Sequence, residues 1–257
     1  MPRGTLPVIE LFGPTVQGEG FLAGRVSHFI RFGGCPYRCS WCDSLHAVLP
    51  EEIKKTVKHM PVDSIVEAIN ELGPAPYITL TGGDPVMWDL TELIGSDLKH
   101  KYKFAVETEG ALWKDWLRAC AHVTLSPKGP SSGMDIKMNW DMLDRYLNEL
   151  GPIPTYWRAT QLSVKIPIEY QNLEDLKFAK DVFQFCFKLA TDKGFKQLKT
   201  YLSVVTKQPP DWGAGAKNDI LKSYAWLLDQ VKADPELHHA TVLPQLHVLA
   251  WGPGRGI

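Results

Sequence analysis

Short apolar runs alternate along the chain with longer segments in which apolar residues recur every three or four positions. The short runs predict strands at residues 7–12, 26–32, 77–81, 103–108, 122–126, 161–168, 199–206 and 245–251. The longer segments predict helices at residues 62–72, 91–100, 114–121, 140–150, 172–190 and 219–233. This alternation is typical of a parallel sheet with helices on its outside. About six such units are too few to close an eight-stranded barrel, so we expect a single α/β domain over residues 1–257 that forms a partly open barrel.

Polar and glycine-rich residues directly follow four of the predicted strands. A loop with three cysteines follows residues 26–32, and the sequence TGGDP at residues 81–85 ends the next strand. ETEG at residues 107–110 and SPKG at residues 126–129 end the two strands after that. In parallel α/β sheets the ligand site lies at the carboxyl ends of the strands. The four segments therefore predict one site at one edge of the sheet.

Composition and charge exclude several classes of partner. Lys and Arg number 28 against 29 Asp and Glu, a net charge of −1, so the chain offers no concentration of positive charge for nucleic acid. No apolar run approaches the ~18 residues that cross a bilayer. The first residues also lack the pattern of a secretory signal, and we expect a cytoplasmic protein without a membrane segment. Cys120 and Cys186 stand alone among apolar residues and are expected to be buried, inert thiols.

Cys35, Cys39 and Cys42 form the run CPYRCSWC, which has the spacing C-x3-C-x2-C. Three thiolates this close can hold three corners of a cubane 4Fe–4S cluster and leave the fourth iron open to a chelating ligand. With Trp41 before the last cysteine, the run is similar to the signature of radical S-adenosylmethionine (SAM) enzymes. Zinc is an alternative, although a zinc site normally takes its fourth ligand from a second half-site that this sequence does not offer. A loop that binds no metal is the third alternative.

Further motifs extend the resemblance over almost the whole chain. They are T-x-QGEG at residues 15–20, Arg31 ahead of the cysteines, CDS at 42–44, TGGDP at 81–85, ETEG at 107–110, SPKGPSSGM at 126–134, SVKIPI at 163–168 and QLHVLAWG at 245–252. In this order they resemble the 7-carboxy-7-deazaguanine synthases, ring-contracting radical SAM enzymes of deazapurine biosynthesis. The fold that the resemblance implies is a modified, partial (β/α)6 barrel of the TIM type with a radical SAM core.

The resemblance implies a set of cofactor ligands. The three cysteines of the CPYRCSWC run would bind the 4Fe–4S cluster, and Ser44 would bind Mg²⁺ beside the substrate. SAM would bind through Trp41, Cys42, Asp43, Gly83, Ser126, Pro127 and Lys128. Asp84 stands where many relatives have glutamate, which leaves a direct role for its shorter side chain open.

The resemblance also implies a substrate site, made by Val16, Gln17, Gly18, Glu19, Arg31, Thr81 and His247. Backbone amides of residues 16–18 would meet the edge of a pterin ring, and Glu19 would accept its guanidine-like N–H groups. Arg31 would bind a carboxylate through its planar fork. An ion pair within the fold is the other role open to Arg31, and a core position is the other role open to His247.

The implied reaction converts 6-carboxy-5,6,7,8-tetrahydropterin into 7-carboxy-7-deazaguanine and ammonia, as a carbon–nitrogen lyase in queuosine-type biosynthesis. A 5′-deoxyadenosyl radical would remove hydrogen from C6 of the pterin and later be restored, so that SAM is not consumed. The implied partners are a flavodoxin or ferredoxin-type reductant and a second copy of the chain in a homodimer. Two other functions stay open. One is a glycyl-radical-enzyme activase, which would act on a protein and consume SAM, and the other is a zinc-stabilised binding protein without catalysis.

Overall fold

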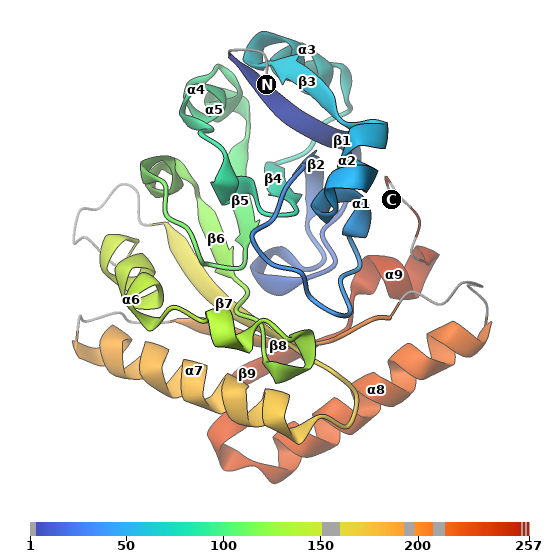
Figure 1. Ribbon diagram of the computed structural model, residues 1–257, viewed down its shortest axis with the longest axis vertical. Helices are drawn as coiled ribbons and strands as arrows, with labels where there is room; N and C mark the ends of the chain where they lie inside the picture. Colours follow the sequence, from blue (N-terminus) through green and yellow to red (C-terminus); the bar gives the residue numbers. More distant parts are fainter. Residues whose placement is uncertain are drawn as a thin grey trace.

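One nine-stranded sheet forms the frame of the molecule in the computed structural model, which describes residues 4–150, 160–192, 198–207, 214–252, 254 and 256 (Figure 1). The strand order is β3-β1-β2-β4-β5-β6-β7-β8-β9. The strands are β1 (Thr5–Val16), β2 (Val26–Phe32), β3 (Lys58–Pro61), β4 (Tyr77–Gly82), β5 (Lys103–Thr108), β6 (His122–Leu125), β7 (Gln161–Ile168), β8 (Lys199–Val204) and β9 (Ala240–Leu243). From β2 through β9 neighbouring strands pair in parallel, whereas β1 is antiparallel to both β2 and β3.

The helices surround a sheet that is bent into an arc (Figure 1). They are α1 (Leu45–Val48), α2 (Pro50–Thr56), α3 (Val62–Glu71), α4 (Thr91–Gly95), α5 (Leu98–Lys101), α6 (Trp140–Glu149), α7 (Leu173–Asp192), α8 (Ala214–Ala233) and α9 (Leu246–Trp251). Single 3-10 turns are η1 (Gly20–Leu22), η2 (Pro85–Met87), η3 (Asp115–Ala119), η4 (Pro130–Ser132), η5 (Asp135–Lys137) and η6 (Pro235–Leu237). Because β3 and β9 are the two ends of the sheet, the barrel is not closed. The expected α/β fold with a partial barrel is confirmed.

Three sequence-based expectations about the elements are wrong. The strand expected at residues 245–251 is helix α9, and the last strand, β9, lies just before it. A six-residue apolar run does not distinguish a strand from a short buried helix by its period, which is why the pattern misled. The helix expected at residues 114–121 is the 3-10 turn η3, and that expected at 91–100 is the two short helices α4 and α5. The loops that follow the predicted helix at 140–150 and the strand at 199–206 lie largely outside the described residues.

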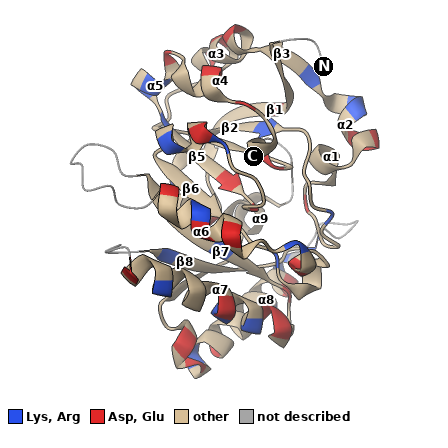
Figure 2. Cartoon of the chain, turned by 60° about the vertical axis from the view of Figure 1, so that its left-hand side comes forward, with Lys and Arg blue, Asp and Glu red and all other residues tan. Residues whose placement is uncertain are grey.

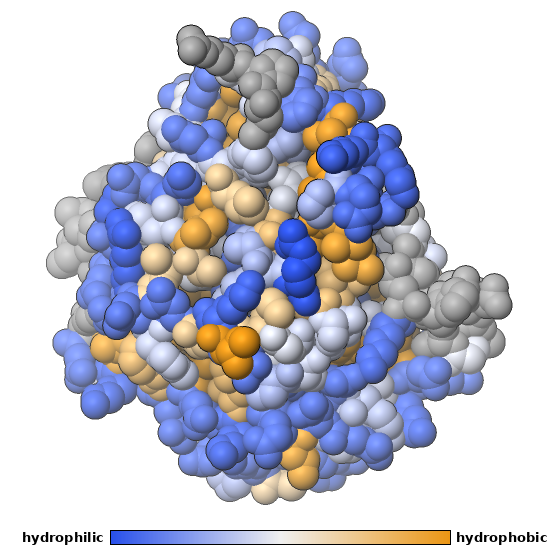
Figure 3. All heavy atoms as spheres, in the orientation of Figure 1, coloured by the Kyte–Doolittle hydropathy of each residue, from blue (hydrophilic) through white to orange (hydrophobic). Residues whose placement is uncertain are grey.

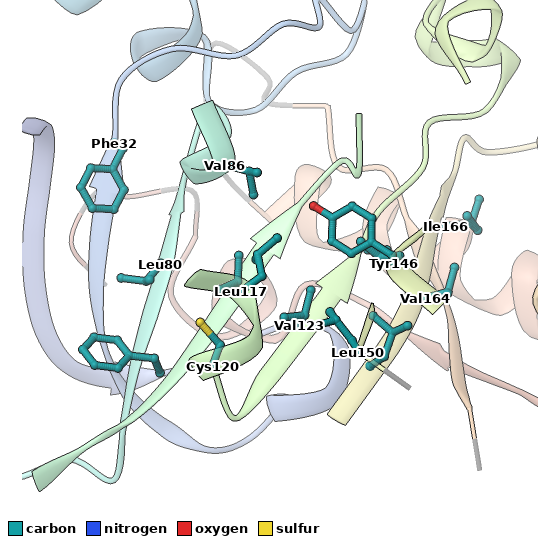
Figure 4. Close-up of a cluster of buried hydrophobic side chains, with 14 of the residues drawn as sticks. Phe32, Leu80, Val86, Leu117, Cys120, Val123, Tyr146, Leu150, Val164 and Ile166 are labelled. Carbon is teal, nitrogen blue, oxygen red and sulfur yellow. The ribbon is translucent and has the colours of Figure 1, made fainter. Parts of the chain in front are cut away.

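The core lies between the convex face of the sheet and the helices. In β7 the residues Leu162, Val164, Ile166 and Ile168 are buried in this core, and alternate positions of the other strands join them. Figure 4 shows such side chains from β2, β4, β6 and β7, with the phenol ring of Tyr146 on α6 among them. Cys120 and Cys186 belong to the same cluster, are 3% and 0% exposed, and form no disulfide. The expected burial of both thiols is confirmed, and it raises the pKa of the Cys186 thiol to about 12.

The outer surface carries charges of both signs side by side, for example along α7 and α8 (Figure 2). On the face drawn in Figure 3, hydrophobic side chains are interspersed with hydrophilic ones. In the part of the chain that the structure describes, no helix combines the length and the apolar character needed to span a bilayer.

Candidate active site

A cavity of about 330 Å³ lies at the carboxyl ends of the parallel strands, beside the cysteine loop. Almost every residue that the sequence predicted for a site lines it: Val16, Gln17, Glu19, Arg31, Cys35, Cys39, Trp41, Cys42, Asp43, Ser44, Thr81, Gly83, Ser126, Lys128 and His247. Gly18 and Pro127 are not part of the lining. Segments more than 200 residues apart in the chain thus meet at one place, as in other parallel α/β sheets.

Strand alternation explains which side chains reach the cavity. In β7 the apolar residues face the helices, so Ser163, Lys165 and Pro167 face the opposite way, and Lys165 and Pro167 line the cavity. The same rule places Glu107 of β5 in the lining. Neither Lys165 nor Glu107 was assigned a role from the sequence. The available signal was a charged residue at an inner position of an otherwise apolar strand.

The cysteine loop presents its three thiols to the cavity. Cys35, Cys39 and Cys42 are partly buried, and the backbone N–H of Tyr37 donates to the sulfur of Cys35 at 3.4 Å. Burial raises the pKa of the Cys35 thiol to about 12. Lys128 is close enough to the thiols to oppose this effect electrostatically. Among the described residues, no group of three or more His, Cys, Asp or Glu side chains is placed so that it could hold a single metal ion.

Helix α7 anchors the cysteine loop from outside the cavity. The indole N–H of Trp41 donates to Ser131 Oγ at 2.9 Å, and Ser131 in turn donates its hydroxyl to Asp175 at 2.6 Å. Asp175 is fully buried and also accepts the backbone N–H groups of Ser131 and Glu169. The position of Trp41 therefore depends on a buried carboxylate more than 130 residues further along the chain.

The TGGDP segment is packed too closely for side chains at its glycines. A Cβ on Gly83 would lie 2.1 Å from the carbonyl oxygen of Gly34, which leads into the cysteine loop. Asp84, which is fully buried, accepts hydrogen bonds from Val86 N (2.7 Å) and from Thr108 Oγ1 (2.7 Å). Burial raises the pKa of this carboxyl group to about 7, against the effect of these hydrogen bonds. Asp84 thus joins the end of β4 to the end of β5.

Arg31 lines the cavity within a group of polar partners. In the parallel pairing of β2 with β4 it stands beside Thr81. Its Nε donates to Glu10 Oε2 at 3.1 Å, and Nη1 donates to Ser44 Oγ at 3.2 Å. Burial would raise the pKa of Glu10, but hydrogen bonding to His46 and the charge of Arg31 lower it overall. Among the described residues these two bonds use two of the five N–H donors of Arg31, so the guanidinium forms an ion pair and still has donors for a ligand.

A buried lysine joins two carboxylates on the other side of the cavity. Lys165 donates to Glu19 Oε2 and to Glu107 Oε2, the latter at 3.0 Å. Burial would raise the pKa of Glu19, but Lys165, aided by His247 and Gln245, holds it at about 2. The pKa of Glu107 is raised, because burial outweighs the attraction of Lys165 and Glu19 adds repulsion. The two carboxylates therefore differ in how firmly they hold a proton.

The loop at residues 17–20 and helix α9 pack against each other. The N–H of Leu246 donates to the carbonyl of Gly18 at 3.1 Å, and a Cβ on Gly18 would lie 2.0 Å from Nδ1 of His247. The absence of a side chain at Gly18 therefore allows His247 its position, although Gly18 itself does not line the cavity. The backbone N–H of Gln17 already donates to the carbonyl of Arg25 at 2.8 Å, so it is not available to a ligand as the sequence suggested. Only the side chain of Gln17 offers donors, 3.5 Å from Glu107.

Comparisons with known proteins agree with this geometry. Residues 29–144 match the family model of the radical SAM superfamily. The chain is 34% identical to a 7-carboxy-7-deazaguanine synthase of Bacillus subtilis over the full length of both proteins. It is 33% identical to the synthase of Bacillus cereus, over 98% of this chain and 99% of that protein. The crystal structure of QueE from Escherichia coli superposes with a TM-score of 0.59 over 95% of each chain at 20% identity, a likeness in fold.

The site and these comparisons define a radical SAM protein, and this class implies a 4Fe–4S cluster and SAM as cofactors. Within that class, the chain belongs to the 7-carboxy-7-deazaguanine synthase family, because its identity to the B. subtilis protein extends over the whole of both sequences. The cysteine loop fits the cluster, since three unpaired thiols line the cavity beside Lys128.

Proposed function

We propose that the protein converts 6-carboxy-5,6,7,8-tetrahydropterin into 7-carboxy-7-deazaguanine with loss of ammonia, as a carbon–nitrogen lyase of 7-deazapurine biosynthesis. One observation carries the proposal. A single cavity is lined by the three cysteine thiols, by the guanidinium of Arg31 and by the carboxylates of Glu19 and Glu107. The full-length identity to a synthase of this name supports it. A cluster and SAM, once bound, supply a carbon-centred radical that removes hydrogen from the substrate.

Arg31 would bind the carboxylate of the pterin. Its fork keeps N–H donors beyond those used by Glu10 and Ser44, and the carboxylate of Glu10 fixes the plane of the guanidinium. Because Glu10 already balances the charge of Arg31, the empty site is not left with an unpaired buried cation. Thr81 stands beside Arg31 on β4 and would contact the same end of the substrate.

Glu19 and Glu107 would receive the N–H groups at the other end of the pterin. Charged carboxylates make stronger hydrogen bonds to N–H groups than neutral acceptors do, and the low pKa of Glu19 keeps it charged at any physiological pH. The side chains of Val16 and His247 line the cavity on the same loop-and-helix side as Glu19, and Gly18 keeps His247 in place.

Ser44 would be a ligand of Mg²⁺. Its hydroxyl lies between Arg31 Nη1 (3.2 Å) and Asp43 Oδ1 (3.0 Å). Mg²⁺ takes oxygen ligands and keeps several waters, so a hydroxyl oxygen, the carboxylate of the substrate and waters would complete its shell. The ion would therefore bind together with the substrate rather than before it.

The remaining predicted residues would hold SAM. Ser126 and Lys128 are joined by a hydrogen bond of 2.7 Å, and both line the cavity beside the thiols. Gly83, which packs against the carbonyl of Gly34, lines this side together with Trp41 and Asp43. Pro127 does not line the cavity, and it would act by setting the positions of its neighbours Ser126 and Lys128. A flavodoxin or ferredoxin would supply the electron that reduces the cluster. We also propose that two copies of the chain form a homodimer.

The decisive test is anaerobic incubation of the reconstituted protein with the carboxytetrahydropterin, SAM, Mg²⁺ and a reductant, followed by mass spectrometry. We expect 7-carboxy-7-deazaguanine and ammonia in equal amounts, with product in large excess over 5′-deoxyadenosine. An activase would instead release 5′-deoxyadenosine stoichiometrically and leave the pterin unchanged. A colourless protein that retains zinc after the same treatment would contradict both enzymatic functions.

Cys39→Ala and Cys186→Ala form a matched pair for this test. Cys39 lines the cavity, whereas Cys186 is a buried core thiol of α7. We expect the first variant to lose product formation and the visible absorbance of the cluster, and the second to keep both. Turnover in Cys39→Ala at the level of the wild type would overturn the ligand assignment.

A further inference from the structure

Gln245 connects the substrate side of the cavity to the cofactor side. It precedes α9, lines the cavity and is only 8% exposed. Its side-chain nitrogen, Nε2, donates to Glu19 Oε1 and, at 3.0 Å, to Asp43 Oδ2. One amide group therefore bridges the loop at residues 17–20 and the end of the cysteine loop.

The two partners of this amide determine which way it points. An ionised carboxylate can only accept hydrogen bonds, and Glu19 stays ionised because Lys165 and its other neighbours hold its pKa at about 2. The atom between the two carboxylates must therefore be the nitrogen rather than the oxygen. The usual ambiguity of a glutamine side chain does not arise here, because the hydrogen-bond network excludes the rotated form.

The other end of the amide has no partner. Gln245 Oε1 is buried, and in the described ranges of the chain no donor lies within hydrogen-bond distance of it. A buried acceptor without a partner is costly, and native proteins satisfy nearly all such groups. Because Gln245 lines the cavity, a ligand that supplies a donor there would remove this cost.

We propose that Gln245 is a specificity-determining residue whose side-chain carbonyl accepts a hydrogen bond from an N–H group of the substrate. The inference rests on the proposed function, since a tetrahydropterin carries several ring and exocyclic N–H groups. Gln245 is bonded to Glu19, the carboxylate assigned above to the N–H groups of the substrate, and it directly precedes the helix that carries His247. Its carbonyl therefore belongs with the residues proposed to meet the substrate rather than SAM.

Gln245→Met tests the proposal, because methionine keeps the length of the side chain and removes both the donors and the acceptor. On the cluster-loaded protein, anaerobic calorimetry would measure the affinities for the carboxytetrahydropterin and for SAM separately. We expect pterin affinity to fall about 10- to 100-fold, or roughly 1.4 to 2.8 kcal/mol, with unchanged SAM affinity and cluster absorbance. Gln184→Met is the matched control, because Gln184 donates to Glu236 at 3.0 Å on the exposed surface of α7, and neither affinity should change.

Either of two binding results would overturn the inference: unchanged pterin affinity in Gln245→Met, or a loss of SAM affinity larger than the loss of pterin affinity. If the methionine variant does not retain its cluster, Gln245→Asn takes its place. Asparagine keeps the amide but is too short to span both carboxylates, and at least about a tenfold loss of pterin affinity is expected. Wild-type protein that neither binds nor converts the pterin would refute the proposed function itself, whereas normal conversion by Gln245→Met would refute only this inference.

Discussion

Replacing Lys165 by methionine removes the only charge that joins Glu19 to Glu107 among the described ion pairs. The lysine side chain is 8% exposed and the two glutamates are 19% and 18% exposed, so the three charges are largely desolvated. The wild-type neighbours, Lys165 foremost, hold the pKa of Glu19 at about 2, against an ordinary value of 4.5 for glutamate. At 1.36 kcal/mol per pKa unit this preference for the charged form is worth about 3 kcal/mol. That figure agrees with the 3–5 kcal/mol typical of breaking a buried ion pair.

The loss depends on pH in a defined direction. In the wild type the pKa of Glu19 is lowered, so its contribution to stability is present above pH 4.5 and is lost only as the pH falls toward about 2. In Lys165→Met, burial raises the pKa of both glutamates, and two unbalanced carboxylates face each other at high pH. Protonation relieves this repulsion, so the stability of the variant should approach that of the wild type as the pH falls from 8 to 5.

Anaerobic calorimetry of the cluster-loaded protein would measure the effect. At about 3 kcal/mol and roughly 2–4 °C per kcal/mol for a chain of this size, we expect Tm to fall by roughly 6–12 °C at pH 8 and by less at pH 5. Lys180→Met is the matched control, because Lys180 also joins two carboxylates, those of Asp234 and Glu236, but on the solvent-exposed surface. Its Tm should stay near that of the wild type. A shift in Lys165→Met no larger than the control, or one independent of pH, would refute the reasoning.

Three further substitutions test the two ends of the cavity. Arg31→Ala should weaken pterin binding by at least about tenfold with an intact cluster spectrum, and loss of iron would show instead that the residue is structural. Ser44→Ala should abolish the dependence of turnover on added Mg²⁺, and an unchanged Mg²⁺ titration would remove it from the ion's ligands. Gly18→Ala would place a Cβ 2.0 Å from His247 Nδ1, so binding of the pterin should fall, whereas Gly95→Ala, with open space around it, should not affect binding.

The sequence predicts the frame of the fold well where a strand is largely buried and bounded by turns. The runs at 26–32, 103–108 and 161–168 coincide with β2, β5 and β7. Prediction from the sequence fails where the local pattern of apolar and polar residues does not distinguish a strand from a helix or a loop. The edge strand β3 is short and exposed on most of its residues, and α9 consists of an apolar run too short to show a helical period. Both elements owe their conformation to contacts with distant parts of the chain.

The same distinction applies to the candidate site. Residues that stand in contiguous motifs, such as the cysteines and the TGGDP segment, could be selected from the sequence and do meet at one cavity. The partners that hold them could not be selected. Lys165 lies 146 residues from Glu19 and 58 from Glu107, and their meeting depends on the strand order and on the inward side of β7. Asp175, which anchors Trp41 through Ser131, could not be selected either, because in the sequence it is an aspartate in a helical segment without a motif.

The cavity is lined by two groups of charged residues, one around Arg31 and one around Lys165. They differ in net charge, and this difference would orient the substrate. Arg31 and Glu10 balance each other, and Arg31 keeps donors for a further anion. The group of Lys165, Glu19 and Glu107 contains one more carboxylate than ammonium, so it repels an anion and attracts N–H donors. A ligand with a carboxylate at one end and a guanidine-like edge at the other would be favoured in one orientation and disfavoured in the reverse. Lys165→Met removes the positive charge of one group, so at high pH it should strengthen the preference for this orientation. Arg31→Ala removes the group that would bind the carboxylate, and with it the preferred orientation.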